Sequence, residues 1–251
     1  MDVEGALGWI VFDHPERRNA ISVEMWDEIP RAAYALARDE RVRVVLLRGA
    51  GEEAFVSGAD ISEFERARSG AESGEYERRN QAAFAALAEL DKPVVAMLHG
   101  FCVGGGCALA LCADLRWAAD DASFAIPAAR LGLGYPLAGL RALVSVVGPA
   151  HAKEILFTAR RFGAAEAREM GLVNAVVPKA ELEAEVRSLA GAIAANAPLT
   201  LRALKRAVRE LGRDAAERDD KETARQVRAC FESEDYREGV RAFLEKRQPR
   251  S

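Results

Sequence analysis

The sequence contains no long run of apolar residues. Its longest apolar stretches, such as 94–98 and 108–112, are far shorter than the roughly 20 residues that a membrane-spanning helix needs. The N-terminus reads Met1-Asp2-Val3-Glu4, without the basic segment and apolar core of a secretory signal. We therefore expect a protein with no membrane partner, located in the cytoplasm.

Neither sign of charge is in large excess. The 35 basic and 39 acidic side chains of the 251 residues leave a net charge of −4. This balance lacks the basic footprint of a nucleic-acid-binding protein, so no nucleic-acid partner is expected. The hydrophobic share is 50%, which is typical of a globular protein long enough to bury a sizeable core. We expect one catalytic body with a smaller extension.

Cysteine is scarce, and the four cysteines are too few for a disulfide framework in a chain of this size. Cys102, Cys107 and Cys112 are spaced by five, a step that drifts around a helix instead of stacking on one face. Neither a histidine nor a CxxC pair accompanies them. The pattern favours small, packed thiols, and no metal site is expected.

Strand-like and helix-like segments alternate along the first part of the chain. This alternation predicts an α/β fold with right-handed crossovers and a helix-covered parallel sheet. From Leu182 onward only helices are predicted, with Pro198 in a first turn and Asp214 as a cap. The predicted strands are 6–12, 42–47, 93–98, 115–119 and 172–177, and the predicted helices are 23–38, 74–90, 108–111, 137–147, 149–158 and 235–246.

A glycine-rich segment at 100–109 lies where a buried strand is predicted to end and a helix to begin. Glycine lets the backbone approach a ligand closely, and a helix N-terminus offers unpaired amide donors to an anion. No Gly-Lys-Ser/Thr follows, and the spacing does not fit a dinucleotide fingerprint. By itself the segment is equally compatible with a plain tight turn.

A second segment, Ala54-Phe-Val-Ser-Gly58-Ala59-Asp60-Ile61, precedes the Gly104-Gly105-Gly106-Cys107 run. The pair resembles the two signature stretches of the crotonase, or enoyl-CoA hydratase/isomerase, superfamily. In that family the residue after the first motif's glycine and the middle glycine of the triplet donate backbone amides to an oxyanion hole. The resemblance therefore implies that Ala59 and Gly105 hold a thioester oxygen as it becomes an enolate.

The resemblance extends over nearly the whole chain. The segment 17–20 resembles the family's CoA-contacting turn, 172–177 its late strand and 233–247 its C-terminal helix. By resemblance, Phe243 and Lys246 reach CoA from this or an adjacent subunit, although a solvated helix end would explain Lys246 equally well. The CoA-contacting residues that the resemblance implies are Arg18, Ala20, Ala59, Asp60, Ile61, Phe243 and Lys246.

The resemblance also implies an architecture. It predicts an acyl-CoA-binding core of spiralling ββα units over 1–195 and a helical C-terminal trimerisation module over 196–251. Homotrimers, often paired into hexamers, are the expected assembly. Coenzyme A enters as part of the acyl-CoA substrate, so no separate cofactor is expected.

The chain departs from the hydratase pattern at two positions. Where hydratases of this family carry a glutamate after Gly-Gly-Gly-Cys and another after the proline of the next motif, this sequence has Ala108 and Ala128. Paired carboxylates position the attacking water and move its proton. Their absence argues against ordinary hydration, and the loss of the second also weakens a double-bond isomerase.

Tyr135 is the polar residue that remains in this region. The stretch 130–141 resembles that of methylmalonyl-CoA decarboxylases, in which a tyrosine occupies this place without a glutamate pair. Decarboxylation needs an oxyanion hole, a hydrogen bond that orients the carboxylate and a proton source, but no strong base. Tyr135 is equally compatible with a half-buried packing residue at a turn.

Three functions stay open. The preferred one is an acyl-CoA lyase of this family that decarboxylates a carboxyacyl-CoA. The second is a hydratase or isomerase with a relocated acid–base residue such as Glu154, Asp120 or Asp121. The third is an acyl-CoA-binding protein without turnover.

Overall fold

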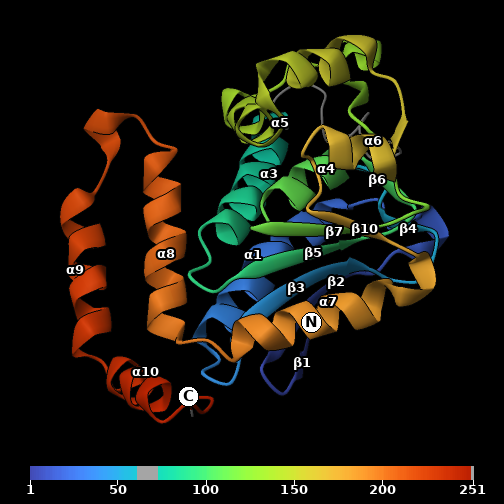
Figure 1. The fold of residues 1–251 in the computed structure, drawn as a ribbon. Helices are drawn as coiled ribbons and strands as arrows, with labels where there is room; N and C mark the ends of the chain where they lie inside the picture. The colour runs from blue at the N-terminus through green and yellow to red at the C-terminus, as the bar shows by residue number, and fades with distance from the viewer. Residues whose placement is uncertain (61–72, 250–251) are drawn as a thin grey trace.

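The computed structural model describes residues 1–60 and 73–249, and its centre is a six-stranded sheet (Figure 1). The strand order is β1-β2-β3-β5-β7-β10, and every neighbouring pair is parallel except the antiparallel β1 and β2. The predicted parallel sheet is confirmed, and β1 is an addition at its edge. The strands are β1 (Asp2–Glu4), β2 (Leu7–Phe12), β3 (Val44–Gly49), β5 (Val94–Leu98), β7 (Leu115–Ala119) and β10 (Ala175–Val177).

Helices cover both faces of this sheet because its central strands are apolar on both sides. In β3, Val45 and Leu47 belong to the main core with helices α1 (Val23–Arg38) and α3 (Ser73–Ala88). Val44 and Leu46 point to the other face and pack with α7 (Leu182–Ala194). Figure 1 shows α7 running along the face opposite α3.

A second sheet was not predicted. It has the order β4-β6-β8-β9, with strands β4 (Ala54–Val56), β6 (Phe101–Val103), β8 (Ser123–Ala125) and β9 (Phe162–Gly163). These strands are too short to show an alternating pattern in the sequence. The strand predicted over 93–98 ends at Leu98 as expected, but the unpredicted strand β6 intervenes before the helix begins.

The two sheets are built by one repeated unit. A strand of the large sheet is followed by a strand of the small sheet and then by a helix: β3-β4-α3, β5-β6-α4 and β7-β8-α5. Here α4 is Gly105–Leu111 and α5 is Leu137–Thr158. This succession is the ββα spiral that the family resemblance implied, and it brings the ends of β4 and β6 next to each other.

Helix α5 consists of two helices joined by a kink. Gly148 has φ 74°, a left-handed conformation that favours glycine, and Pro149 follows it. The predicted helices 137–147 and 149–158 are thereby confirmed. Among residues 1–60 and 73–249, no helix combines the length and apolar character required to cross a bilayer. Helix α6 (Ala164–Glu169) follows β9.

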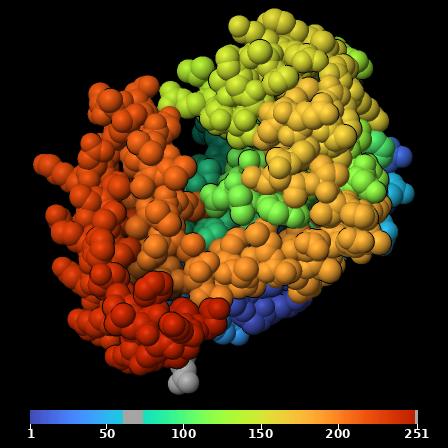
Figure 2. Space-filling model, viewed as in Figure 1, coloured from blue at the N-terminus to red at the C-terminus, as the bar shows by residue number. Residues whose placement is uncertain are grey.

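Three C-terminal helices stand beside the core: α8 (Pro198–Leu211), α9 (Asp220–Glu232) and α10 (Glu234–Leu244). They occupy the left of Figure 1, and Figure 2 shows a hollow between them and the rest of the chain. Pro198 is in the first turn of α8, as predicted. The predicted cap at Asp214 is wrong, because its side chain caps no helix, whereas the Asp219 carboxylate accepts the Glu222 amide at the start of α9.

Candidate active site

A tight turn at residues 14–20 is held by hydrogen bonds to the segment 54–60. Asn19 is buried, and its side-chain amide donates hydrogen bonds to the carbonyl oxygens of Ala50 (2.9 Å) and Ala54 (2.7 Å). The Ser57 amide donates to the Arg18 carbonyl oxygen (3.1 Å). The turn that resembles a CoA-contacting turn therefore lies directly beside the Gly58-Ala59-Asp60 motif.

Arg18 and Ala20 flank Asn19 in that turn. The exposed Arg18 side chain forms an ion pair with Glu53 (3.3 Å), and its guanidinium carbon lies 4.9 Å from the centroid of the Phe101 ring. Ala20 is buried. Arg18 thus presents a cation at the surface, whereas Ala20 can offer only backbone groups and a methyl to a ligand.

Asp60 is held as a structural residue beside this turn. Its buried carboxylate forms an ion pair with Arg17 (3.6 Å), and its amide donates to the Ile21 carbonyl oxygen (3.0 Å). An acid engaged in this way is poorly placed to move protons. The predicted CoA contact at Ile61 lies outside the described residues.

Gly58 and its neighbours fix the direction of the Ala59 amide. Gly58 has φ 123°, a conformation that side chains rarely adopt, and its carbonyl oxygen accepts the Ile21 amide (2.8 Å). The Ile21 amide donates to Gly58, and the Ile21 carbonyl oxygen accepts the Asp60 amide, so Ile21 is paired with both neighbours of Ala59. The Ala59 amide therefore points away from Ile21.

The glycine triplet brings a second amide to the same place. Gly104 has φ 53° and precedes α4, whose first residue is Gly105. A Cβ on Gly106 would lie 2.2 Å from the Val56 carbonyl oxygen, so only glycine allows β4 and α4 to approach this closely. A Cβ on Gly105 would lie 3.6 Å from the Ala59 nitrogen.

Ala59 and Gly105 therefore lie close together in space. Within residues 1–60 and 73–249, neither amide donates a hydrogen bond. Two backbone N–H groups that converge on one point can hold an oxygen that gains negative charge. The structure brings together the two residues that the sequence analysis paired, although 46 positions separate them.

Trp26 of α1 borders this pair of amides, which the sequence analysis did not foresee. Its indole atoms Cη2 and Cζ2 would lie 3.6 and 3.7 Å from a Cβ on Gly105. The indole Nε1–H donates to the Tyr76 hydroxyl oxygen (3.2 Å) on α3. The only sequence signal was the apolar face of helix 23–38, because the contact joins segments far apart in the chain.

Tyr135 lies near Cys107 and Cys112, within and just after α4. Its ring is partly buried in the main core, and its edge would meet a Cβ on Gly139 at 2.8 Å. Burial, followed by the charges of the Cys107 and Cys112 thiolates, raises the pKa of Tyr135 well above its ordinary range. The phenol therefore remains a neutral hydrogen-bond donor, and no residue in the described part of the chain accepts its proton.

The cysteines of this region are packed thiols, as predicted. The Sγ atoms of Cys102 and Cys107 are 4.0 Å apart, and the Cys107 thiol donates to the Cys102 carbonyl oxygen (2.9 Å). Burial raises the pKa of Cys112 to about 12. Burial also raises the pKa of Cys102, so the Cys102 and Cys112 thiols resist ionisation and are poor nucleophiles.

The carboxylates considered as relocated acid–base groups are engaged elsewhere. The hydrogen bond from Arg160 lowers the pKa of Glu154, which disfavours a role as a general acid. Asp120 accepts the Lys179 amide (3.1 Å), and Asp121 forms an ion pair with the Lys179 ammonium group (2.8 Å).

Phe243 and Lys246 lie at the C-terminal end of the chain. Phe243 is in α10 and is 83% exposed, and Lys246 follows that helix with φ 53°. Figure 1 shows α10 well apart from β4, β6 and α4. Within one chain, these two residues are therefore not gathered with Ala59 and Gly105.

Known proteins resemble this chain over nearly its whole length. The family model described as enoyl-CoA hydratase/isomerase matches residues 2–250. A crotonyl-CoA hydratase of Syntrophomonas wolfei is 37% identical over 247 residues, which cover 98% of this chain and 95% of that protein. A carnitinyl-CoA dehydratase of Escherichia coli K12 is 36% identical over 253 residues, with 98% and 94% covered.

Solved structures agree in fold. The crystal structure of an enoyl-CoA hydratase/isomerase family protein from Hyphomonas neptunium has a TM-score of 0.95 at 40% identity, covering 99% of this chain and 95% of that chain. An enoyl-CoA hydratase from Mycobacterium smegmatis has a TM-score of 0.88 at 32% identity, with 99% and 96% covered. The predicted crotonase-like fold is confirmed, and the chain belongs to the enoyl-CoA hydratase/isomerase family of the crotonase superfamily.

Proposed function

We propose that this enzyme binds an acyl-CoA thioester and stabilises its enolate with the amides of Ala59 and Gly105. One observation carries the proposal: the Cβ position of Gly105 is only 3.6 Å from the Ala59 nitrogen, and neither amide has a hydrogen-bond acceptor within residues 1–60 and 73–249. The thioester oxygen would accept both N–H groups as negative charge develops on it. Removing one such donor from comparable sites costs about 3–4 kcal/mol of transition-state stabilisation.

The preferred reaction is the decarboxylation of a carboxyacyl-CoA. The bond between the α carbon and the carboxylate breaks, carbon dioxide leaves, and the electron pair moves into the thioester to form the enolate. The α carbon then takes a proton from water. Ala108 and Ala128 provide no carboxylate here, which suits a reaction that needs no strong base. Tyr135 would orient the departing carboxylate through its neutral hydroxyl.

The direct test uses two thioesters. Purified protein is incubated separately with crotonyl-CoA and methylmalonyl-CoA, and both reactions are followed by mass spectrometry. We expect loss of carbon dioxide from methylmalonyl-CoA, and we expect Tyr135→Phe to abolish it while the protein stays folded. Hydration of crotonyl-CoA with no change in methylmalonyl-CoA would exclude decarboxylation as the main activity.

Hydration or isomerisation is the second candidate. The relatives named crotonyl-CoA hydratase and carnitinyl-CoA dehydratase favour it, since both names describe addition or removal of water. It would require an acid–base group other than the two family glutamates. The engagement of Glu154, Asp120 and Asp121 in contacts of their own argues against those three.

A binding protein without turnover is the third candidate. Such a protein would bind the thioester through the same pair of amides as the enzyme, but no product would form. Tight binding of several acyl-CoA thioesters, with each recovered unchanged, would support it.

Assembly into trimers or hexamers is part of the proposal. The three C-terminal helices expose apolar side chains at helical spacing, which a neighbouring subunit would cover. The module 196–251 would then bring Phe243 and Lys246 to the CoA of an adjacent subunit. The exposed side chains are Leu204, Val208 and Leu211 on α8, Val227 and Phe231 on α9, and Tyr236, Val240, Phe243 and Leu244 on α10.

A further inference from the structure

A glycine in the first turn of α5 is not explained by its backbone conformation. Gly139 is the third residue of this helix, after the N-cap Pro136, and its φ lies outside the left-handed region that favours glycine. Within a helix, glycine is less favourable than alanine, because glycine loses more backbone freedom on folding. The space around Gly139 is therefore the remaining reason for a glycine here.

One side chain limits that space. A Cβ on Gly139 would lie 2.8 Å from Cε1 and 3.3 Å from Cδ1 of the Tyr135 ring, whereas carbon atoms in contact are normally about 3.5–4.0 Å apart. A methyl group would therefore displace the ring. The helical glycines Gly191 in α7 and Gly239 in α10 differ, because a Cβ on either would meet nothing within 4 Å.

Packing, and not a hydrogen bond, sets the position of the Tyr135 ring. The residue is half-buried against the main core, and in the part of the chain that the structure describes its hydroxyl has no hydrogen-bond partner. The preceding Gly134 brings no support, since even a Cβ there would touch nothing within 4 Å. The edge of the ring that meets Gly139 is thus one of the few contacts that define where the hydroxyl lies.

The ring is also close to the helix that begins at Gly105. The Cys107 thiol, two residues after Gly105, is near enough to Tyr135 to influence its pKa, and α4 and α5 are in contact. A hydrogen bond weakens steeply when its donor is misplaced, and small misplacements of a group that orients a substrate cost large factors in rate. Displacement of this ring would therefore be felt in catalysis.

We propose that Gly139 is a positioning residue: because it has no side chain, the Tyr135 ring can pack against α5 and direct its hydroxyl toward the substrate carboxylate. This inference rests on the proposed function, because it takes Tyr135 as the group that orients the departing carboxylate. Gly139 itself contacts no substrate and acts only through the ring.

The test is a double-mutant cycle of Gly139→Ala and Tyr135→Phe with methylmalonyl-CoA. We expect Gly139→Ala to lower kcat by roughly 10–10²-fold while KM changes little, because the amides of Ala59 and Gly105 are untouched. In the Tyr135→Phe background, long incubations followed by mass spectrometry should show no further loss of the residual rate. A glycine with a merely structural role would lower the rate by the same factor in both backgrounds.

A crystal structure of Gly139→Ala supplies the second measurement. The Tyr135 ring should be displaced from its present position, with α4 and the Gly105 amide where they are now. An unmoved ring would overturn the inference, even if the rate has fallen.

Gly191→Ala is the matched control, since it makes the same change in a helix where a methyl meets nothing. It should leave kcat unchanged, with a melting temperature equal to or above that of the unaltered protein. Rates are compared at a temperature at which circular dichroism shows every variant to be folded. An unchanged kcat in Gly139→Ala beside an inactive Tyr135→Phe would overturn the inference and leave the proposed function standing. Full activity of Tyr135→Phe, or no turnover by the unaltered protein, would mean that the proposed reaction fails, and the inference with it.

Discussion

At the scale of single residues, a substitution at Gly105 is expected to affect catalysis and not folding. A methyl at this position would be in ordinary contact with Trp26 and the Ala59 nitrogen, at 3.6 Å from each. It would also fill the space that a thioester oxygen needs between the two amides. We expect Gly105→Ala to lower kcat/KM by roughly 10²–10³-fold while the melting temperature changes little. Steady-state kinetics and thermal unfolding of the same preparation check both parts.

A substitution at the adjacent Gly106 is expected to affect folding instead. A methyl there would lie 2.2 Å from the Val56 carbonyl oxygen, a distance that the backbone of β4 cannot accommodate without moving. We expect Gly106→Ala to lower the melting temperature clearly. If Gly105→Ala destabilises the protein as much as Gly106→Ala does, its kinetic effect says nothing about the amides.

The raised pKa of Tyr135 predicts a pH-dependent contribution to stability. Because burial raises its pKa in the folded state above the ordinary value of 10.0, the unfolded chain loses this proton first as pH rises. The contribution of Tyr135 is thus complete below pH 10 and is lost as pH increases above it. We expect the unfolding free energy of Tyr135→Phe to fall less steeply above pH 10, by about 1.4 kcal/mol per pH unit at most.

Urea unfolding at pH 8 and at pH 11 measures this difference. Other tyrosines, lysines and cysteines titrate in both proteins, so only the difference between the two curves is attributed to Tyr135. Parallel curves would mean that the phenol is solvated and unsuited to orient a substrate carboxylate in a dry site.

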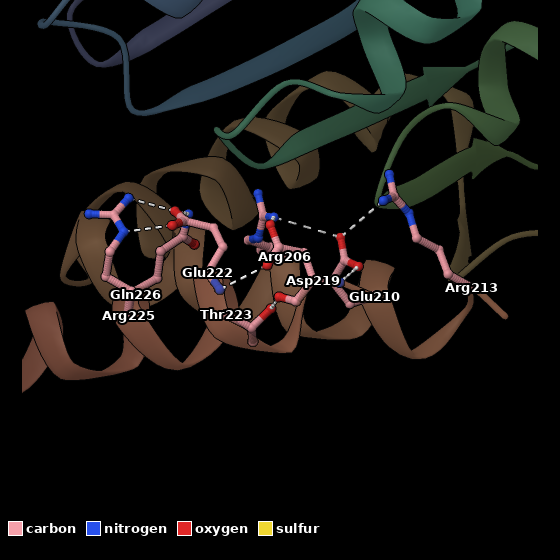
Figure 3. Close-up of polar contacts among 8 residues, drawn as sticks. All are labelled: Arg206, Glu210, Arg213, Asp219, Glu222, Thr223, Arg225 and Gln226. Atoms are coloured by element: carbon pink, nitrogen blue, oxygen red, sulfur yellow. Dashed lines mark hydrogen bonds and ion pairs between the residues drawn. The ribbon is translucent and has the colours of Figure 1, made fainter. Parts of the chain in front are cut away.

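At the scale of elements, the joint between α8 and α9 depends on one buried carboxylate. Glu210 accepts the Asp219 amide (3.0 Å) and forms ion pairs with Arg213 (3.4 Å) and Arg206 (4.0 Å), as Figure 3 shows. Without Glu210, the Asp219 amide loses its acceptor, whereas Arg213 is 41% exposed and Arg206 keeps its ion pair with Asp219 (3.2 Å). We expect Glu210→Ala to loosen α9 by about 1–2 kcal/mol.

Amide hydrogen exchange locates this effect. Faster exchange is expected in α9, with that of α1 unchanged. Glu234→Ala serves as the control, since Glu234 and its partner Arg237 are both exposed and such pairs contribute less than about 1 kcal/mol. Equal exchange in the two variants would show that apolar contacts, not Glu210, hold α8 and α9 together.

The helices and strands also differ in how well the sequence predicts them. The helix 23–38 and the strand 115–119 were predicted with their observed bounds, because apolar periodicity is strong in the first and the second is a short, mostly apolar run around Trp117. The second sheet was missed because its strands have two or three residues. Both Asp214 and Asp219 precede helical segments, and only Asp214 was predicted as a cap; the Asp219 side chain is the one that accepts an amide of the helix that follows it.

In the candidate site, too, some residues could be predicted from the sequence and others could not. Ala59 and Gly105 were paired through motifs that resemble a family's motifs. They are 46 residues apart in the sequence, and no local pattern could have predicted that they are adjacent in space. Trp26 was not assigned to the site. Its place beside Gly105 arises from the packing of α1 against α4, which periodicity does not specify.

At the scale of the whole molecule, the open question is which subunit supplies Lys246. Since α10 lies apart from β4 and α4 in one chain, we expect Lys246 to act at the site of a neighbour. Gly105→Ala and Lys246→Ala should then each be nearly inactive alone. In co-expressed mixtures, about a quarter of the sites would combine an intact Gly105 from one chain with an intact Lys246 from the next.

Recovery of about a quarter of the activity in the mixture would establish sites shared between subunits, provided that light scattering shows the expected trimer or hexamer. No recovery would assign Lys246 to the site of its own chain, which would require α10 to move from its observed position. Full activity of Lys246→Ala alone would instead make this lysine a solvated helix end. Exposed apolar side chains on α8, α9 and α10 would still need a partner, so the oligomer could persist without sharing its active sites.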